Sequence, residues 1–443
     1  MTETTDPTTT RILPPLRPAA PGLVPIVVIN LARAADRLAV IADHLGGLGL
    51  AFTRFDAWDG RADPEMLARR MQPHPLTVEY GRALTEGEIG CAASFQDVME
   101  SIAAGPDPFV CVLEDDALSD DDLLFLMSHD SDAFNRWQAG QDYATRLLIA
   151  SVKALRKDKA PPDPSRFIEA LGQVASDEIL EPALRAQTLA LPSETDLARV
   201  IAKDIDPDAI HKARNTLRRK LAQTLGARLE GIYEEMAVKE PYAPVPDQIA
   251  RRTLRNSVLG LLTARGTAAD VARAARHFNS ASNLTDEIAG LAALSETRGS
   301  ERKTAFERFY ERWHDDHIVI DHWFLYQAAI PHPGTLATVK RLARHPLMSL
   351  ENPNKVRTLI GAFAANPVAF NRPDGAGYDF VAERILQIDR FNPQLAARLL
   401  TAFRSWRTLE STRRKLAERA LKGISKSKPL SRDVYEIVTR TLE

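Results

Sequence analysis

Residues 109–127 read Phe-Val-Cys-Val-Leu-Glu-Asp-Asp-Ala-Leu-Ser-Asp-Asp-Asp-Leu-Leu-Phe-Leu-Met, and two folding patterns meet within them. The apolar run at residues 109–113 is typical of a buried β-strand. An acidic run follows, and from Leu123 onward apolar residues recur at helical spacing, with short connectors rich in Pro, Asp and Ser. The sequence therefore predicts an α/β region over residues 22–120 and a helical region over residues 121–443, so that the protein is mainly α.

The composition indicates a globular protein with no overall attraction to polyanions. Of its 443 residues, 44% are hydrophobic and 26% are charged, and the net charge is −2. This balance predicts neither nucleic acid nor an anionic membrane as a partner, and no run of about 18 apolar residues predicts a transmembrane helix. Cys91 and Cys111 lie in apolar segments and predict buried thiols in a reducing, cytoplasmic compartment. Residues 1–21, rich in Thr, Pro and Ala, predict a disordered leader.

Strands and helices are predicted to alternate through the α/β region. Residues 25–30 (Pro-Ile-Val-Val-Ile-Asn) predict a strand buried on both faces, and residues 38–48 carry one apolar stripe that predicts a helix. Further strands are predicted at 52–55 and 109–113, with a helix over residues 85–104 between them, opened by a capping-box sequence. This β-α-β-α-β order predicts a parallel sheet, whose ligands bind beyond the carboxyl ends of the strands.

Three adjacent carboxylates, Glu114, Asp115 and Asp116, follow the third predicted strand. Carboxylates this close repel one another unless water solvates them or a cation bridges them. A hard divalent cation such as Mn²⁺ or Mg²⁺ takes oxygen ligands and would hold a diphosphate. The alternative is a solvated turn that continues into the acidic residues 120–122. The acidic run alone leaves both interpretations open.

The order of short motifs through the α/β region resembles glycosyltransferase family 25. The motifs are residues 28–31 (Val-Ile-Asn-Leu), 36–37 (Asp-Arg), 55–60 (Phe-Asp-Ala-Trp-Asp-Gly), 84–91 (Leu-Thr-Glu-Gly-Glu-Ile-Gly-Cys) and 112–117 (Val-Leu-Glu-Asp-Asp-Ala). The resemblance implies a GT-A-like nucleotide-sugar fold. It assigns the metal, Mn²⁺ or Mg²⁺, to Glu114 and Asp116, and the nucleotide sugar to Arg33, Asp36, Arg37 and Asp59. Alternatively, Arg37 is a plain cation on the surface of a helix.

Two departures from the family weaken the case for sugar transfer. Ser94-Phe95 stands where the family usually has Ser-His, and the resemblance ends within a few residues of Asp116. In this family the second half of the domain supplies the carboxylate base and the wall that positions the acceptor. The α/β region is therefore interpreted as a truncated half-domain, with glycosyltransferase activity absent or very weak.

The helical region is predicted to be an α-solenoid of HEAT- or armadillo-like helix pairs. Leu395, Leu399, Phe403 and Trp406 are one example of its apolar stripes. Neighbouring helices would bury one another's stripes, and no strand pattern interrupts them. We also expect a protein partner on this region.

The same region resembles the C-terminal domain of bacterial aminopeptidase N. The resemblance is carried by residues 129–137, 252–256, 283–286, 321–324, 374–378 and, at greatest length, 352–363 (Asn-Pro-Asn-Lys-Val-Arg-Thr-Leu-Ile-Gly-Ala-Phe). It implies a helical bowl that closes over the active site of such a peptidase and carries no zinc. The zinc motif His-Glu-x-x-His occurs nowhere in the sequence. Neither bound zinc nor aminopeptidase activity is therefore expected.

The nearest imitation of a metal motif is Trp313-His314-Asp315-Asp316-His317, with His322 beyond it. Its spacing could hold a metal. His and Asp also commonly occur where two helices join. Because the matching segment of the resembled family is structural, we favour a helix junction.

The two resemblances leave three functional hypotheses. The favoured one is a fusion of a partial glycosyltransferase with the non-catalytic helical domain of a zinc aminopeptidase, which acts as a helical scaffold or interaction module. The second is a metal-dependent glycosyltransferase that uses a nucleotide-sugar donor for lipopolysaccharide or other cell-surface polysaccharide synthesis. The third is an aminopeptidase N fragment that needs the missing catalytic domain.

Overall fold

The computed structural model describes residues 25–31, 35–47, 50–59, 86–103, 110–114, 119–130 and 132–443. The chain divides into two compact units, Met1–Ser119 and Asp120–Glu443. The leader predicted at residues 1–21 lies outside the described residues, as do the side chains of Cys91 and Cys111.

The sheet of the N-terminal unit has three parallel strands, β1 (Ile26–Asn30), β2 (Thr53–Asp56) and β3 (Cys111–Glu114). Their order is β2-β1-β3, and Val28 of β1 lies opposite Arg54 of β2 and Leu113 of β3. The middle strand is buried from Val27 to Asn30. The predicted parallel sheet, with a strand buried on both faces, is confirmed.

Among the described residues of this unit, two helices lie between the strands in sequence. α1 (Ala35–Gly47) follows β1 and ends at the predicted Gly-Gly breaker, and α4 (Glu86–Ala103) precedes β3. Val98 of α4 packs with Val27, Ile29 and Phe55 in a small core. The predicted capping residue Thr85 lies outside the described residues.

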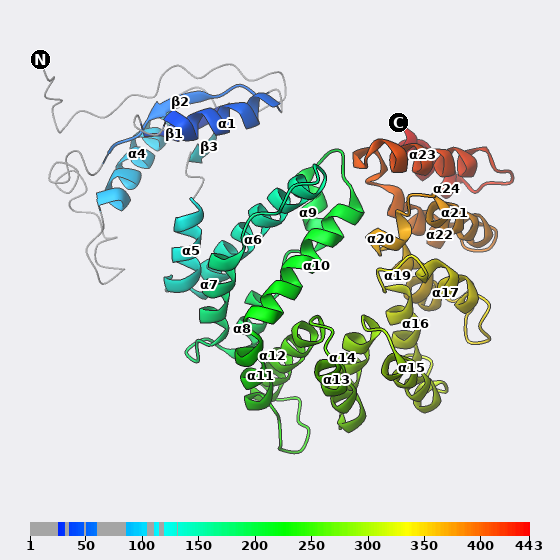
Figure 1. The fold of residues 1–443 in the computed structure, drawn as a ribbon. Helices are drawn as coiled ribbons and strands as arrows, with labels where there is room; N and C mark the ends of the chain where they lie inside the picture. Colours follow the sequence, from blue (N-terminus) through cyan, green and yellow to red (C-terminus); the bar gives the residue numbers. More distant parts are fainter. Residues whose placement is uncertain are drawn as a thin grey trace, which may run out of the picture. The chain divides into compact units, whose positions relative to one another are not determined.

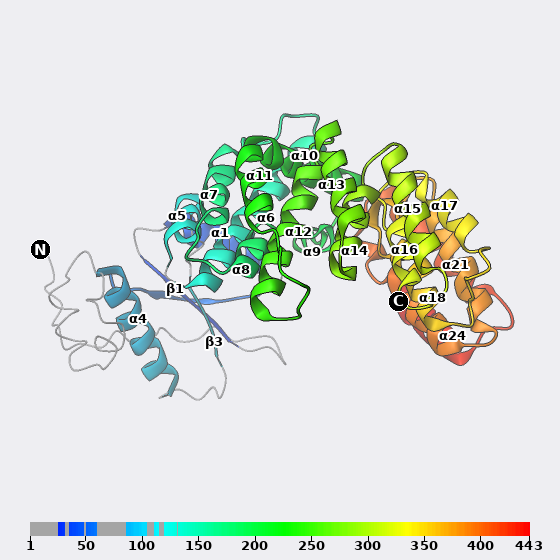
Figure 2. The ribbon, with the colours of Figure 1, turned by 90° about the horizontal axis from the view of Figure 1, so that it is seen from below.

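The helical unit begins with α5 (Asp120–His129), and helix follows helix to the C-terminus (Figures 1 and 2). The other elements are α6 (Ala133–Leu155), α7 (Ser165–Ala175), α8 (Pro182–Thr188), α9 (Glu194–Ile201), α10 (Pro207–Thr224), α11 (Gly226–Glu235), α12 (Pro246–Thr263), α13 (Ala268–Ser280), α14 (Leu284–Ser295), α15 (Ser300–Trp313), α16 (Ile320–Ala328), α17 (Thr335–Leu342), α18 (Pro353–Val356), the π-helix η1 (Arg357–Gly361), α19 (Ala362–Ala364), α20 (Pro367–Phe370), α21 (Ala376–Asp389), α22 (Pro393–Leu400), the 3₁₀ turns η2 (Thr401–Phe403) and η3 (Trp406–Thr408), α23 (Ser411–Lys426) and α24 (Arg432–Leu442). Among the described residues, no helix is both long enough and apolar enough to cross a membrane.

One continuous hydrophobic core runs through the helical unit, from Leu123 in α5 to Val438 in α24. Helices that are neighbours in sequence pack together, such as α5 with α6, α13 with α14, and α21 with α22. In a solenoid, each helix pair buries the apolar face of the next pair in this way. The predicted α-solenoid is confirmed.

Polar side chains in the connectors begin many of these helices. Ser193 accepts a hydrogen bond from the backbone N–H of Asp196 at the start of α9, and Asn283 accepts one from the N–H of Asp286 at the start of α14. Each cap accepts a hydrogen bond from a backbone N–H group in the first turn, which has no partner within the helix itself. The short polar connectors are therefore helix start signals.

A backbone bridge joins two parts of the helical unit that are far apart in sequence. Ile205, just before α10, pairs in parallel with Leu409, just before α23. The Ile205 N–H donates to the carbonyl of Thr408 at 2.9 Å, and the Glu410 N–H donates to the carbonyl of Ile205 at 2.9 Å. We call residues 205–208 and 408–413 the clasp.

Arg413 adds ion pairs to the clasp. Its buried guanidinium lies 3.6 Å from Asp206, 3.4 Å from Glu410 and in contact with Asp208. Nearby, α10 also contacts α20. The clasp therefore connects the first third of the solenoid directly to its last quarter.

The interpretation of Leu395, Leu399, Phe403 and Trp406 as a single helical stripe is wrong. The last three of these side chains are buried, but α22 ends at Leu400, and Phe403 and Trp406 belong to separate 3₁₀ turns. The Trp406 indole donates to the carbonyl of Thr441 at 2.8 Å, and the next segment becomes extended to form the clasp. Tertiary contacts override the helical pattern here.

Candidate functional site

The described residues predicted to bind metal or nucleotide sugar lie toward one edge of the parallel sheet. Glu114 is the last residue of β3, and Asp59 follows shortly after the end of β2. The first turn of α1, which follows β1, contains Asp36 and Arg37. Because the carboxyl ends of parallel strands share one edge, each of these positions lies at or after the end of a strand on that edge. Two further predicted residues, Arg33 and Asp116, lie outside the described residues.

The loop that carries Asp59 is held by its neighbour Trp58. The buried Trp58 donates its backbone N–H to Ser94 Oγ at 2.8 Å and its indole N–H to Asp97 Oδ2 at 2.7 Å. Ser94 and Asp97 are themselves fully buried in α4. Ser94 therefore positions the loop. The motifs contained Trp58 and Ser94 but gave no signal for Asp97, whose role depends on helix packing.

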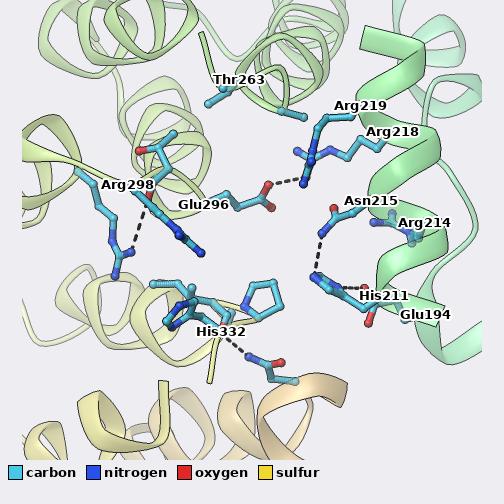
Figure 3. Close-up of a pocket in the computed structure, with 18 of the residues that line it drawn as sticks. Glu194, His211, Arg214, Asn215, Arg218, Arg219, Thr263, Glu296, Arg298 and His332 are labelled. Atoms are coloured by element: carbon cyan, nitrogen blue, oxygen red, sulfur yellow. Dashed lines mark hydrogen bonds and ion pairs between the residues drawn. The ribbon is translucent and has the colours of Figure 1, made fainter. Parts of the chain in front are cut away.

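A cavity of about 1190 Å³ opens among the helices of the second unit (Figure 3). α9 and α10 form one wall, and Val271 and residues within 263–266, 296–302, 325–332 and 362–367 also line the cavity. In Figure 3, Arg214, Asn215 and His211 of α10 lie across the cavity from Arg298, with Glu296 between them. The site combines segments from the middle third of the chain with others more than 100 residues further on.

Arginine dominates the charge of this cavity. Six arginines and two glutamates line it. Arg265 is neutralised by ion pairs with Asp270 and Glu230, and Arg218 is neutralised by Glu296. The other four have no carboxylate within ion-pair distance in the part of the chain that the structure describes. They are Arg214, Arg219, Arg298 and Arg302, and we call them the free arginines.

Two of the free arginines are partly withdrawn from water. Arg214 donates to the backbone carbonyls of Pro192 at 2.8 Å and Leu191 at 3.3 Å, and Arg302 donates to that of Thr297 at 3.4 Å. Burial lowers the pKa of both guanidinium groups, because a low dielectric disfavours the charged form. Carbonyl groups orient these cations without cancelling their charge, so the cavity favours anions.

A hydrogen-bonded chain lies beside the arginines. His211 Nδ1 is 2.7 Å from Glu194 Oε1, and Asn215 Nδ2 is 2.8 Å from His211 Nε2. With both ring nitrogens engaged, the imidazole has a fixed orientation. Within the described part of the chain, neither nitrogen contacts a hydroxyl or thiol that it could activate. This arrangement can shape a binding site but does not form a nucleophile–base pair.

Two of the three histidines in residues 313–322, His314 and His322, take part in ring stacking. His314 stacks on Tyr310 with centroids 5.5 Å apart, and His322 stacks on Tyr326 at 6.3 Å. Lys355 also holds this segment in place, because its ammonium group donates a hydrogen bond to the carbonyl of His317. Within the described ranges, no group of three or more His, Cys, Asp or Glu side chains could hold a metal ion.

Comparison with known proteins assigns the helical unit to a family. Residues 120–443 match the family described as "Domain of unknown function (DUF3458_C) ARM repeats", and the chain belongs to this family. Aminopeptidase N of Caulobacter vibrioides is 38% identical over 322 residues, which are 72% of this chain and 37% of that protein. Aminopeptidase N of Escherichia coli K12 is 34% identical over 325 residues, 73% of this chain and 37% of that protein.

A solved structure shows the same helical arrangement. The Legionella pneumophila aminopeptidase A in complex with aspartic acid has a TM-score of 0.67 and 26% identity, and the similarity covers 75% of this chain and 39% of that one. The chain thus spans about 37% of the length of the curated peptidases that it matches.

The N-terminal region is similar to a second family. Residues 24–159 match glycosyltransferase family 25 (LPS biosynthesis protein). The probable inactive glycosyltransferase 25 family member 3 of Rattus norvegicus is 31% identical over 114 residues, 25% of this chain and 20% of that protein. The family match extends past Asp116, where the short motifs end, into residues that form α5 and α6. The chain is therefore a fusion of a region similar to this transferase family with an aminopeptidase-N-like helical region.

Sequence reasoning missed the arginine-lined cavity. The one local signal was residues 211–220 (His-Lys-Ala-Arg-Asn-Thr-Leu-Arg-Arg-Lys), which place Arg214 and Arg218 one helical turn apart. Arg298 and Arg302 lie about 80 residues further on, and only the packing of α10, α14 and α15 reveals that they share a cavity.

Proposed function

We propose that this protein is a non-catalytic interaction module whose helical unit binds an anionic ligand. The observation that carries the proposal is the set of free arginines around one cavity. A guanidinium withdrawn from water gains most from a carboxylate or phosphate, which it can bind through two parallel hydrogen bonds. A ligand with several negative charges would supply the free arginines with anionic partners, which the described residues do not provide.

Thermal unfolding in the presence of anions tests this function. A ligand that binds only the folded protein raises the melting temperature as its concentration increases. We expect tripolyphosphate or a glutamate-rich peptide to raise it at low ionic strength, with a smaller shift in 0.5 M NaCl because salt screens the arginines. The proposal fails if no multiply charged anion stabilises the helical unit.

Peptide hydrolysis is not part of the proposed function. Zinc peptidases activate water with a metal held by His and Glu side chains, and the sequence contains no His-Glu-x-x-His segment. We expect no release of amine from alanyl or leucyl amides, with or without added zinc. Release above that of a zinc-free, heat-killed sample would contradict this expectation.

The sheet edge supports a second candidate function, the metal-dependent binding of a nucleotide sugar. It rests on the match to glycosyltransferase family 25 and on the placement of Glu114 and Asp59 at the carboxyl edge. Glu114 and Asp116 would hold Mn²⁺ or Mg²⁺, whose charge would neutralise the diphosphate. Sugar transfer itself would be absent or very slow, since no residue has been assigned as the acceptor base.

Calorimetry with uridine diphosphate tests the second candidate. Binding should require Mn²⁺ or Mg²⁺ and should be lost in Asp116→Ala, whereas Asp43→Ala, a change at an exposed position in α1, should bind normally. Binding that needs no metal, or that survives Asp116→Ala, would rule out the assigned metal site.

A further inference from the structure

The free arginines are distributed in a way that constrains the shape of the ligand. Arg214 and Arg219 belong to α10, whereas Arg298 and Arg302 belong to the connector before α15 and to its first turn. Figure 3 shows Arg298 on the opposite side of the cavity from Arg214. The cavity of about 1190 Å³ is also larger than the roughly 300–1000 Å³ typical of small-molecule sites. A ligand that reaches both walls must therefore carry negative charges at separate points.

The lining of the same cavity is partly apolar. It includes Leu325 of α16 and the connector residues Ile330 and Pro331. An inorganic polyanion would gain nothing from this surface, whereas an apolar side chain would gain by leaving water. A ligand that combines separate negative charges with apolar groups has the chemistry of an acidic peptide segment.

Glu296 shows that an arginine of this cavity already binds a carboxylate. Its side chain makes an ion pair with Arg218, and Arg218 also donates to the carbonyl of Gly260 at 2.8 Å. The Glu296 side chain is 46% exposed, whereas that of Arg218 is only 18% exposed. The arginine is fixed and the carboxylate is accessible, so a carboxylate from a ligand could replace that of Glu296.

We infer that the cavity binds an acidic peptide segment, whose carboxylates pair with the free arginines, and that Glu296 is an internal competitor for Arg218. This inference rests on the proposed anion-binding function and adds the class of ligand. It makes two opposite predictions. Removal of free arginines weakens binding, whereas removal of the Glu296 charge strengthens it.

The test uses the full chain and a blocked peptide, acetyl-Glu-Leu-Glu-Leu-Glu-amide, in isothermal titration at low ionic strength. The matched probes are the same peptide with Gln in place of each Glu, and sodium tripolyphosphate. Arg298→Ala combined with Arg302→Ala should raise the Kd of the acidic peptide at least about tenfold, because charge-assisted hydrogen bonds are lost. Glu296→Gln should lower the Kd about threefold or more, as expected for a partly exposed ion pair.

Two further variants keep the test decisive if the double variant does not fold. Arg219 is exposed on α10 and makes no hydrogen bond with the residues that the structure describes, so Arg219→Ala should fold normally and still weaken binding. Arg390 is also exposed, follows the last residue of α21 and is not among the residues that line the cavity, so Arg390→Ala should leave the Kd unchanged. Circular dichroism confirms the helix content of each variant.

Each outcome decides between the inferences. If tripolyphosphate binds and the acidic peptide does not, the peptide inference is overturned while the anion-binding function stands. If neither binds, both are overturned. Equal binding of the Glu and Gln peptides, or binding that the cavity variants do not weaken, would also overturn the inference, and an unchanged Kd in Glu296→Gln would remove the competitor role.

Discussion

His277 is a buried histidine that stays uncharged in the folded helical unit. Burial and, to a smaller extent, the nearby Arg255 lower its pKa to about 4, against the opposing effect of Asp286. Its Nδ1 lies 2.9 Å from the hydroxyl of Tyr233. Because the pKa is about 6.5 in the unfolded chain, the unfolded state takes up a proton first as the pH falls.

The free energy of unfolding should therefore respond to His277 only below pH 6.5. It should decrease between pH 6.5 and about 4, by up to about 1.4 kcal/mol per pH unit from this group. Urea unfolding at pH 7 and pH 5, for the natural chain and for His277→Phe, measures the difference. The variant is expected to be less stable at pH 7, because Tyr233 loses its hydrogen-bond partner. Its free energy of unfolding should, however, change less with pH than that of the natural chain. Equal pH dependence would show that His277 does not titrate in this window.

Gly290 allows α14 to approach α13 closely. A Cβ atom at Gly290 would lie 2.8 Å from the backbone nitrogen and Cα of Phe278. Gly290→Ala should therefore destabilise the helical unit by about 1–3 kcal/mol. Gly231 in α11 has no atom within 4 Å of such a Cβ, so Gly231→Ala should stabilise the protein by about 0.5–1 kcal/mol. Chemical denaturation of the two variants checks the opposite signs.

At the scale of elements, Arg413 is the main polar group of the clasp. Arg413→Ala leaves Asp206 and Glu410 without their cation and removes the hydrogen bond to the carbonyl of Asn371. We expect a loss of about 1–3 kcal/mol in the free energy of unfolding, since the arginine is buried but its partners are partly exposed. As a control, Arg419→Ala removes an exposed pair with Asp379 and should cost less than about 1 kcal/mol. Similar losses in both variants would mean that the clasp contributes no special stability.

The sequence predicted elements well where one local pattern determines them. The strand at Ile26–Asn30 and the helix at Ala35–Gly47 follow from an apolar run and from a stripe closed by glycines. The chain after Leu400 could not be predicted in the same way. Its helical spacing continues, but contacts with α24 and the extended backbone of the clasp decide its conformation.

The two candidate sites differ in how well they could be predicted from the sequence. The sheet edge follows from strand order, because parallel strands always bring their carboxyl ends together, so Glu114 and Asp59 could be placed in advance. The arginine-lined cavity depends on how α10 packs relative to α15. No local sequence pattern determines the distance between these two helices. A charged residue in a polar connector is usually just solvated, so Arg298 gave no signal of its own.

For the whole molecule, we expect the two units to fold separately. A shortened chain of residues 120–443 keeps the entire continuous core of the helical unit. It should be soluble, helical by circular dichroism, and melt near the main transition of the full chain. The described part of residues 1–119 forms a three-stranded sheet with β2 and β3 at its edges, so this segment alone should aggregate or show weak hydrogen-exchange protection. A single cooperative transition in the full chain would instead reveal a stabilising interface.

The bridge between Ile205 and Leu409 also has a kinetic meaning. Most helix contacts in this unit join neighbours in sequence, and short loops close quickly at little entropic cost. The clasp instead joins groups such as Asp208 and Arg413, which are 205 positions apart, so the helices between them must first assemble. It should be the last contact to form during folding and the first to open. The amide hydrogens of Ile205 and Glu410 should then exchange with solvent through local opening. Those in the middle of α12 should exchange only through global unfolding of the helical unit.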